Sequence, residues 1–123
     1  MMNPIRSVKD LKVYEVSYQL AMEIYFLTKS FPKEEQYALT DQIRRSSRSV
    51  TANIREGFAK RFYENIFIRH LVDSLGSSEE TRTWLEFARD CDYLAHEKFE
   101  ILNNKYDEVS AMLTSLLKKW HTY

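Results

Sequence analysis

The stretch from Phe99 to Trp120, FEILNNKYDEVSAMLTSLLKKW, places apolar side chains at alternating steps of three and four residues. This spacing lines them up on one side of an α-helix, where they form the seam of a helical bundle or coiled coil. The seam residues are Phe99, Leu102, Tyr106, Val109, Leu113, Leu116 and Trp120. The pattern therefore predicts a long amphipathic helix over about residues 95–121.

Three earlier segments carry a similar periodicity, which predicts helices over about residues 8–31, 33–60 and 63–92. Ser7 and Asp10 match a capping box before the first of these helices, and Pro32 suits the first turn of the second. Gly76 lies inside the third and indicates a close contact with a neighbouring helix, with a break in the helix as the alternative. Long helices with short joints predict an all-α, antiparallel up-and-down four-helix bundle that forms one domain over residues 1–123.

The composition supports a helical fold and excludes several other classes. Only two glycines and two prolines occur in 123 residues, and no Asn-Gly or Asp-Gly pair is present, so tight β-hairpins are not expected. Eighteen basic and eighteen acidic residues give a net charge of zero, so any affinity for polyanions must come from local asymmetry. No run approaches the roughly 20 apolar residues of a membrane helix, and the N-terminus lacks a secretory signal, so we expect no membrane partner and a cytoplasmic location.

The sequence offers no recognisable catalytic or metal-binding motif. Phosphate-binding loops need more glycines than Gly57 and Gly76 provide, and no glutamate is followed three residues later by histidine, as di-iron bundles require. The three histidines fall in separate segments, and Cys91 is the only cysteine. We therefore expect no catalytic residues, no cofactor and no metal site.

Basic residues are concentrated on the second predicted helix. The segment from residue 40 to residue 61 holds Arg44, Arg45, Arg48, Arg55, Lys60 and Arg61 against Asp41 and Glu56, a charge of six minus two, or plus four. At 100° per residue, Arg44, Arg48 and Arg55 fall within about 40° of arc and form a ridge along the helix. This ridge, extended by Lys60 and Arg61, is our predicted contact with nucleic-acid phosphates. A solvated face paired with acids such as Glu79 and Glu80 is the alternative.

A further group of polar residues suggests a structural role. Arg45 lies about 100° from the ridge, toward a neighbouring helix, which suggests a polar network of Arg45, Asn53, Glu56 and Glu80 in which Arg45 pairs with Glu80.

The first predicted helix carries a second apolar row that includes Tyr14, Tyr18 and Tyr25. The core of one four-helix bundle is expected to bury only one of the two apolar rows of this helix. These tyrosines therefore either widen the buried face of this bundle or contact another subunit as an oligomer interface.

With these features in place, the chain resembles the 23S rRNA intervening-sequence proteins, which are four-helix bundle proteins. The resemblance rests on Phe31, Pro32, Glu35, Tyr37, Leu39, Gln42, Ile43, Arg44, Arg45, Ser49, Asn53, Ile54, Glu56 and Gly57, and on a second block of Gly76, Ser77, Glu80, Thr83 and Leu85. It implies a small bacterial bundle that assembles as a ring-shaped homopentamer and has no known catalytic activity. A related branch, the accessory variability determinant of diversity-generating retroelements, implies a basic pentamer that binds nucleic acid and a reverse transcriptase.

The chain departs from this family where Arg48, Arg55 and Arg82 replace residues that are commonly apolar, small or acidic, and each change moves the surface toward positive charge. Our first functional hypothesis is a non-enzymatic oligomeric module that binds RNA or DNA through the arginine ridge. The alternative is a protein-interaction scaffold or accessory subunit with no direct role in nucleic-acid binding.

Overall fold

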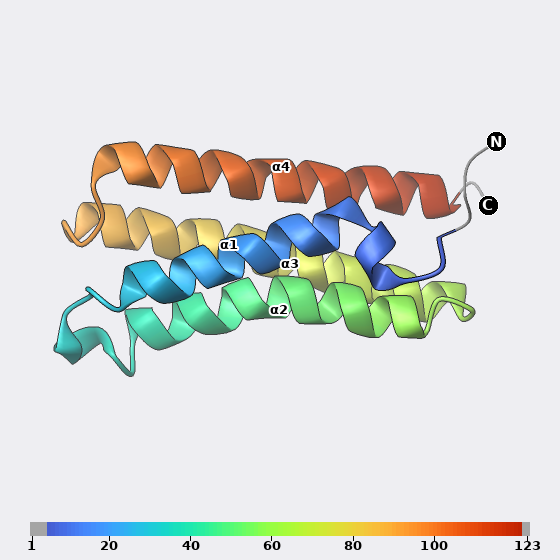
Figure 1. Ribbon diagram of the computed structural model, residues 1–123, viewed down its shortest axis with the longest axis horizontal. Coiled ribbons are helices and arrows are strands. Elements are labelled where there is room, and N and C mark those ends of the chain that lie inside the picture. Colours follow the sequence, from blue (N-terminus) through green and yellow to red (C-terminus); the bar gives the residue numbers. More distant parts are fainter. Residues whose placement is uncertain (1–4, 122–123) are drawn as a thin grey trace.

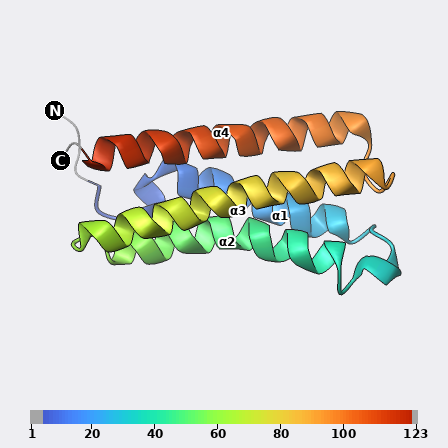
Figure 2. The same ribbon diagram turned by 180° about the vertical axis from the view of Figure 1, so that it is seen from behind.

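The computed structural model describes residues 5–121, which fold into α-helices and short 3₁₀ turns (Figure 1). The elements are η1 (Val8–Asp10), α1 (Lys12–Thr28), η2 (Lys33–Glu35), α2 (Leu39–Ala59), α3 (Glu64–Asp90) and α4 (His96–His121). Successive helices pack against one another, and α1 also packs against α4. Seen from behind, α3 lies between α2 and α4 (Figure 2). The predicted all-α, antiparallel four-helix arrangement is therefore confirmed.

The core of the bundle follows the predicted seam of α4. Phe99, Leu102, Tyr106, Val109 and Leu113 are buried, and Leu116 and Trp120 are partly buried against them. Because these residues recur at steps of three and four, all of them reach the same side of the helix, and their burial supplies the main driving force for packing.

The interface between α2 and α3 is lined with small and hydroxylated residues. Ser74 donates a hydrogen bond of 2.8 Å to the carbonyl of Val50, so the two backbones lie close together. A Cβ added at Gly57 would lie 2.6 Å from the Cβ of His70, whereas one added at Gly76 would meet nothing within 4 Å. The close contact expected at Gly76 is therefore wrong, and it occurs at Gly57 instead. Helix α3 runs through Gly76 without a break.

The first predicted helix, 8–31, is divided in the structure. The Ser7–Asp10 capping box is present, but it caps η1, and Leu11 then takes an extended conformation with φ −87° and ψ 111°. Helix α1 begins only at Lys12 and ends at Thr28, so the predicted boundaries are wrong at both ends.

The second helix starts six residues later than the predicted position 33. Residues 33–35 form η2, and Glu35 then accepts a hydrogen bond of 3.3 Å from the backbone N–H of Leu39, the first residue of α2. The other oxygen of Glu35 accepts a 2.9 Å bond from the hydroxyl of Tyr93, in the loop between α3 and α4. These bonds hold residues 33–38 as a separate segment beside the end of α1.

Helices α3 and α4 lie close to their expected ranges of 63–92 and 95–121. Asp92 has φ 63°, a left-handed conformation that aspartate tolerates and that turns the chain out of α3.

Candidate functional site

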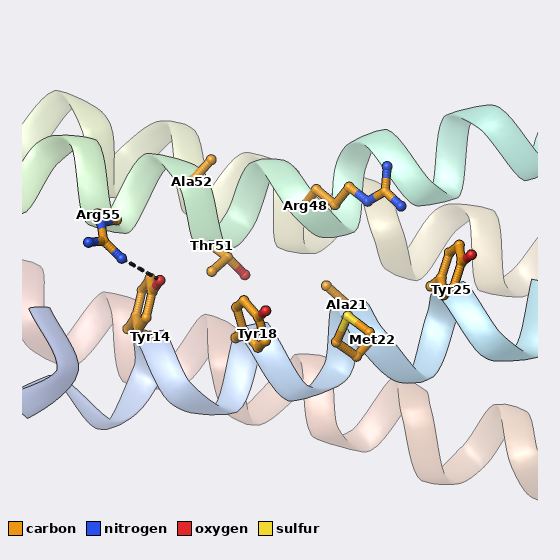
Figure 3. Close-up of a pocket in the computed structure, with 9 residues that line it drawn as sticks. All are labelled: Tyr14, Tyr18, Ala21, Met22, Tyr25, Arg48, Thr51, Ala52 and Arg55. Atoms are coloured by element: carbon orange, nitrogen blue, oxygen red, sulfur yellow. Dashed lines mark hydrogen bonds between the residues drawn. The ribbon is translucent and has the colours of Figure 1, made fainter.

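A groove with a volume of about 290 Å³ runs between α1 and α2, and Figure 3 shows the side chains that line it. We call this feature the aromatic groove. Its lining residues are Tyr14, Tyr18, Ala21, Met22, Tyr25, Arg48, Thr51, Ala52 and Arg55. We predicted different roles for the tyrosine row of α1 and the arginine ridge of α2. The structure places the tyrosines and two of these arginines on one surface.

At one end of the aromatic groove, Arg55 is held by a tyrosine. Its Nη1 donates a 3.2 Å hydrogen bond to the hydroxyl of Tyr14, a side chain that is only 8% exposed (Figure 3). A phenolic oxygen orients the guanidinium but does not neutralise it. Arg55 therefore keeps its full charge at the rim of the groove.

At the other end, three cations converge on the ring of Tyr25. The Nζ of Lys29 lies 4.9 Å from the ring centroid, and the Cζ atoms of Arg44 and Arg48 lie 5.0 and 5.8 Å from it. Arg44 is also fixed by a 2.8 Å hydrogen bond from its Nε to Thr28 Oγ1. Contacts with an aromatic face stabilise cations without removing their charge.

A second cavity, of about 400 Å³, adjoins the groove at Tyr25, and we call it the cationic pocket. It is lined by Tyr25, Thr28, Lys29, Phe31, Pro32, Lys33, Gln36, Thr40 and Arg44. Three of these side chains are cationic and none is acidic. Thr40 is 5% exposed, and its hydroxyl has no hydrogen-bond partner in the described part of the chain.

The arginine ridge does not pair with acids of α3. Among residues 5–121, no carboxylate lies within 4 Å of the side-chain nitrogens of Arg44, Arg48 or Arg55. The acids proposed as their alternative partners contact other residues: Glu79 pairs with Arg82, and Glu80 accepts a 3.0 Å bond from Trp84 Nε1. The three arginines of the ridge are therefore not neutralised within the described chain.

Lys60 and Arg61, the predicted extension of the ridge, lie outside both cavities. Lys60 Nζ pairs with Glu56 at 3.8 Å, and Arg61 stacks 4.1 Å from the ring of Phe58 while donating to the Phe58 carbonyl. A position about 160° round the helix from Arg44 turns Lys60 away from α1.

The predicted pair between Arg45 and Glu80 is wrong. Arg45 Nη1 instead lies 3.7 Å from Asp41, one turn earlier on α2, and the Arg45 side chain is 76% exposed. The space between α2 and α3 at this level is filled by the hydroxyls of Ser46 and Thr81, which are 2.8 Å apart, so long charged side chains stay on the outside.

The other half of the predicted network does form, through a residue that the sequence did not indicate. His70 Nδ1 lies 3.0 Å from Asn53 Oδ1, and its Nε2 lies 3.4 Å from Glu56. His70 thus joins Asn53 to Glu56 across the α2–α3 interface.

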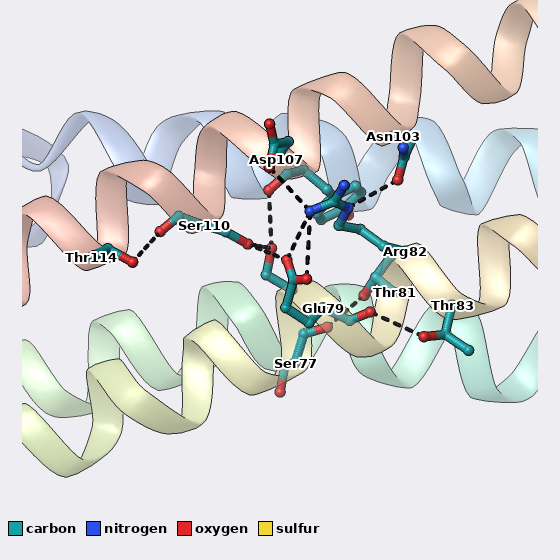
Figure 4. A network of polar contacts seen from close by, with 11 residues as sticks. Ser77, Glu79, Thr81, Arg82, Thr83, Asn103, Asp107, Ser110 and Thr114 are labelled. Atoms are coloured by element: carbon teal, nitrogen blue, oxygen red, sulfur yellow. Dashed lines mark hydrogen bonds and ion pairs between the residues drawn. The ribbon is translucent and has the colours of Figure 1, made fainter.

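Arg82 does not add positive charge to the surface in the way the sequence suggested. Its Nη1 lies 3.1 Å from both Glu79 and Asp107, and its Nε donates to Asn103 at 2.9 Å (Figure 4). These contacts, which we call the Arg82 network, link α3 to α4 and neutralise the guanidinium.

The predicted oligomer interface is also changed by the geometry of the tyrosine row. Tyr14 is buried and Tyr25 is covered by cations, which leaves Tyr18, 51% exposed, as the one member of the three with a largely open ring. Because the row lines the same groove as Arg48 and Arg55, one surface cannot be a closed subunit contact and an open phosphate site together.

Four residues of the cationic pocket were not predicted from the sequence: Lys29, Lys33, Gln36 and Thr40. Lys29 was detectable, since it lies four residues after Tyr25 on the same helix face. Thr40 was detectable for the same reason, since it lies four residues before Arg44 on α2. Lys33 and Gln36 reach the pocket because residues 33–38 form a separate segment beside the end of α1, and no local pattern predicts that.

Among residues 5–121, no helix combines the length and apolarity needed to cross a membrane, and no group of three metal-binding side chains gathers.

Comparisons with known proteins support the four-helix fold. The sequence model of the 23S rRNA-intervening sequence proteins matches residues 9–115. The chain belongs to this family. A solved structure from Bacteroides thetaiotaomicron VPI-5482, described as a protein with unknown function from the S23 ribosomal protein family, aligns with a TM-score of 0.79 and 32% identity over 86% of this chain and 98% of its own. No curated protein matches the chain significantly.

Membership of the 23S rRNA-intervening sequence family confirms the resemblance drawn from the sequence and accounts for the bundle. Because the solved relative is described as having unknown function, neither comparison assigns a role to the aromatic groove or the cationic pocket.

Proposed function

We propose that this protein is a non-enzymatic nucleic-acid-associated bundle, with RNA as the leading partner, and that it binds phosphates through the face shared by α1 and α2. The observation that carries the proposal is the lack of any ion pair to Arg44, Arg48 or Arg55 within residues 5–121. Arg48 and Arg55 are exposed and Arg44 is half-buried. Accessible cations without acidic partners attract phosphate oxygens and release condensed counterions when they bind.

Contacts of this kind give affinity and orientation without reading sequence, because every nucleotide carries the same phosphate. The net charge of the chain is zero, so the attraction must come from this face alone. The proposal assigns no reaction, catalytic residue or cofactor to the protein.

We also propose that copies of the chain form a homo-oligomer, with the pentameric ring implied by the resemblance as the expected form. Exposed apolar side chains on α3 and α4, among them Val72, Phe87 and Ile101, lie outside the aromatic groove. Association through them leaves the groove open and repeats it in each copy. Light scattering after gel filtration tests this, and a lone protomer contradicts it.

The second candidate function is a scaffold for another protein, for example a reverse transcriptase. Tyr18, Met22 and Phe26 are exposed on α1, which favours an apolar protein contact. A pull-down that survives nuclease treatment and high salt supports the scaffold, because phosphate contacts weaken as salt rises.

The test of the main proposal is binding of a structured RNA hairpin, followed by fluorescence anisotropy over a series of salt concentrations. The variant replaces Arg44, Arg48 and Arg55 with glutamine. Losing three phosphate contacts lowers the slope of log affinity against log salt by about 3.

The matched control replaces Lys12, Arg69 and Lys118 with glutamine, since these exposed cations lie outside both cavities. The control is expected to keep most of the slope, and circular dichroism checks that both variants fold. Absence of RNA binding at low salt, or equal losses in the two variants, contradicts the proposal.

A further inference from the structure

The two cavities of the α1–α2 face have complementary chemistry. The aromatic groove offers ring and thioether surface from Tyr18 and Met22, whereas the cationic pocket offers Lys29, Lys33 and Arg44. They meet at Tyr25, which lines both. A ligand that fills the two together needs a flat apolar part joined closely to an anionic part.

An unpaired nucleotide has this combination, because its base exposes a flat face and its phosphate is anionic. In a duplex the base faces are stacked inside the helix, and only phosphates and groove edges reach a protein. The apolar surface of the aromatic groove has no use in binding a duplex backbone.

The room in the aromatic groove comes from small side chains on both helices. Ala21 of α1 and Ala52 of α2 are both among its lining residues, and the half-exposed ring of Tyr18 lies on α1 below Thr51 (Figure 3). A planar base can stack on that ring, and base–aromatic stacking tolerates any sequence.

The cations are placed to hold the phosphates on either side of a stacked base. Arg55 is fixed at one end of the aromatic groove by Tyr14, and Arg48 and Arg44 are gathered on Tyr25 at the other. Like charges brought so close repel one another, and a bound phosphate relieves that repulsion.

We propose that the α1–α2 face binds single-stranded nucleic acid, with an unpaired base in the aromatic groove and flanking phosphates at Arg55 and in the cationic pocket. This inference rests on the proposed function and narrows its ligand from nucleic acid in general to unpaired strands.

The test compares a short oligouridylate and an oligothymidylate with a fully paired duplex of equal length, by fluorescence anisotropy at one salt concentration. Both single strands are expected to bind about tenfold more tightly than the duplex, because stacking adds to the phosphate contacts. The two single-stranded probes also compare RNA with DNA, which differ here in the 2′-hydroxyl and in the C5 methyl group of the base.

The variant Tyr18→Leu keeps an apolar side chain and removes the ring, so it is expected to weaken single-strand binding about tenfold and leave duplex binding unchanged. The matched control is Tyr63→Leu, since Tyr63 is 70% exposed and lines neither cavity. A second measurement does not depend on a variant: oligothymidylate added to the wild-type protein should shift the NMR ring resonances of Tyr18 more than those of Tyr63.

Equal affinity for single strands and duplex, with no effect of Tyr18→Leu, overturns this inference and leaves phosphate binding intact. Failure of every nucleic acid to bind at low salt overturns both proposals. If poly-glutamate competes as well as the oligonucleotides, the face recognises acidic protein segments and the inference is wrong.

Discussion

The α1–α2 face and the α3–α4 face both carry arginines at a helix interface. The two faces differ in whether carboxylates neutralise the guanidinium charge. On α3–α4, Arg82 lies 3.1 Å from the carboxylates of Glu79 and Asp107 (Figure 4). On α1–α2, Arg48 and Arg55 contact a tyrosine ring and a tyrosine hydroxyl. The first arrangement neutralises the charge, whereas the second orients it and leaves it available.

This contrast separates cations that stabilise the bundle from cations that can recruit a ligand. An ion pair that bridges two helices favours the folded state, although solvent screening limits its contribution. An arginine resting on an aromatic face keeps its attraction for phosphate because no acid competes for it. Substitutions on the two faces should therefore change different properties.

The largest expected difference is in affinity for RNA. Replacing Arg48 and Arg55 with glutamine should weaken binding at least about tenfold and lower the salt slope by about 2, since two phosphate contacts are lost. Arg82→Gln should leave both quantities nearly unchanged, because the Arg82 charge is already neutralised. Anisotropy titrations on the two variants measure this, and a similar loss in both would remove the distinction between the faces.

The opposite result is expected for stability. Arg82→Met removes the bonds to Asn103, Glu79 and Asp107 and should lower the free energy of unfolding by about 1–2 kcal/mol, reduced by the exposure of the carboxylates. Arg48→Gln should change it by less than about 0.5 kcal/mol. Urea unfolding monitored by circular dichroism gives both values, and the reverse order would show that the two arginines have been misassigned.

Tyr14→Phe probes the positioning of Arg55 with a smaller change. The variant removes the oxygen that accepts from Arg55 and should cost about 0.5–1.5 kcal/mol of unfolding free energy. Its RNA affinity should fall by less than that of an Arg55→Gln variant, because the charge remains while its orientation is lost. An affinity loss as large as that of Arg55→Gln would mean that the tyrosine hydroxyl itself contacts the ligand.

The last expected effect is on the pH dependence of stability, through the Tyr93–Glu35 hydrogen bond that joins the α3–α4 loop to residues 33–38. The hydrogen bond to Glu35, together with burial, raises the pKa of Tyr93 to about 12 from its ordinary 10.0. Because the folded-state pKa is the higher one, this stabilisation is complete below pH 10 and is lost as pH rises toward 12.

Wild type should therefore lose stability faster than Tyr93→Phe over this pH range, and the difference between their unfolding curves cancels the titration of groups they share. Parallel curves would show that the bond does not hold residues 33–38 in place.

The helices and the seam of α4 could be predicted because they depend on local periodicity. Phe99, Leu102 and Tyr106 repeat at a spacing that only a helix brings to one side, and the structure buries all three. The starts of α1 and α2 could not be predicted, since Leu11 is extended and the start of α2 depends on Glu35, which is held in turn by the distant Tyr93.

The candidate site was predicted in its parts and missed as a whole. Spacing placed Arg44, Arg48 and Arg55 on one side of α2, and Tyr18 and Tyr25 on one side of α1. Spacing within a helix does not determine how two helices are rotated relative to each other. That both rows line the same groove therefore follows only from the packing of α1 against α2. The predicted pairing of Arg45 with Glu80 was wrong for a related reason. Arg45 pairs with Asp41, which lies one turn away on the same helix, and not with an acid across the interface.

Ultraviolet cross-linking of single-stranded RNA to the wild-type protein, followed by mass spectrometry of the cross-linked peptides, locates the bound strand directly. We expect cross-links in peptides spanning residues 14–29 and 44–55, which carry the aromatic groove and part of the cationic pocket. Cross-links confined to α3 and α4, near Phe87 or Ile101, would contradict the assignment of the binding face.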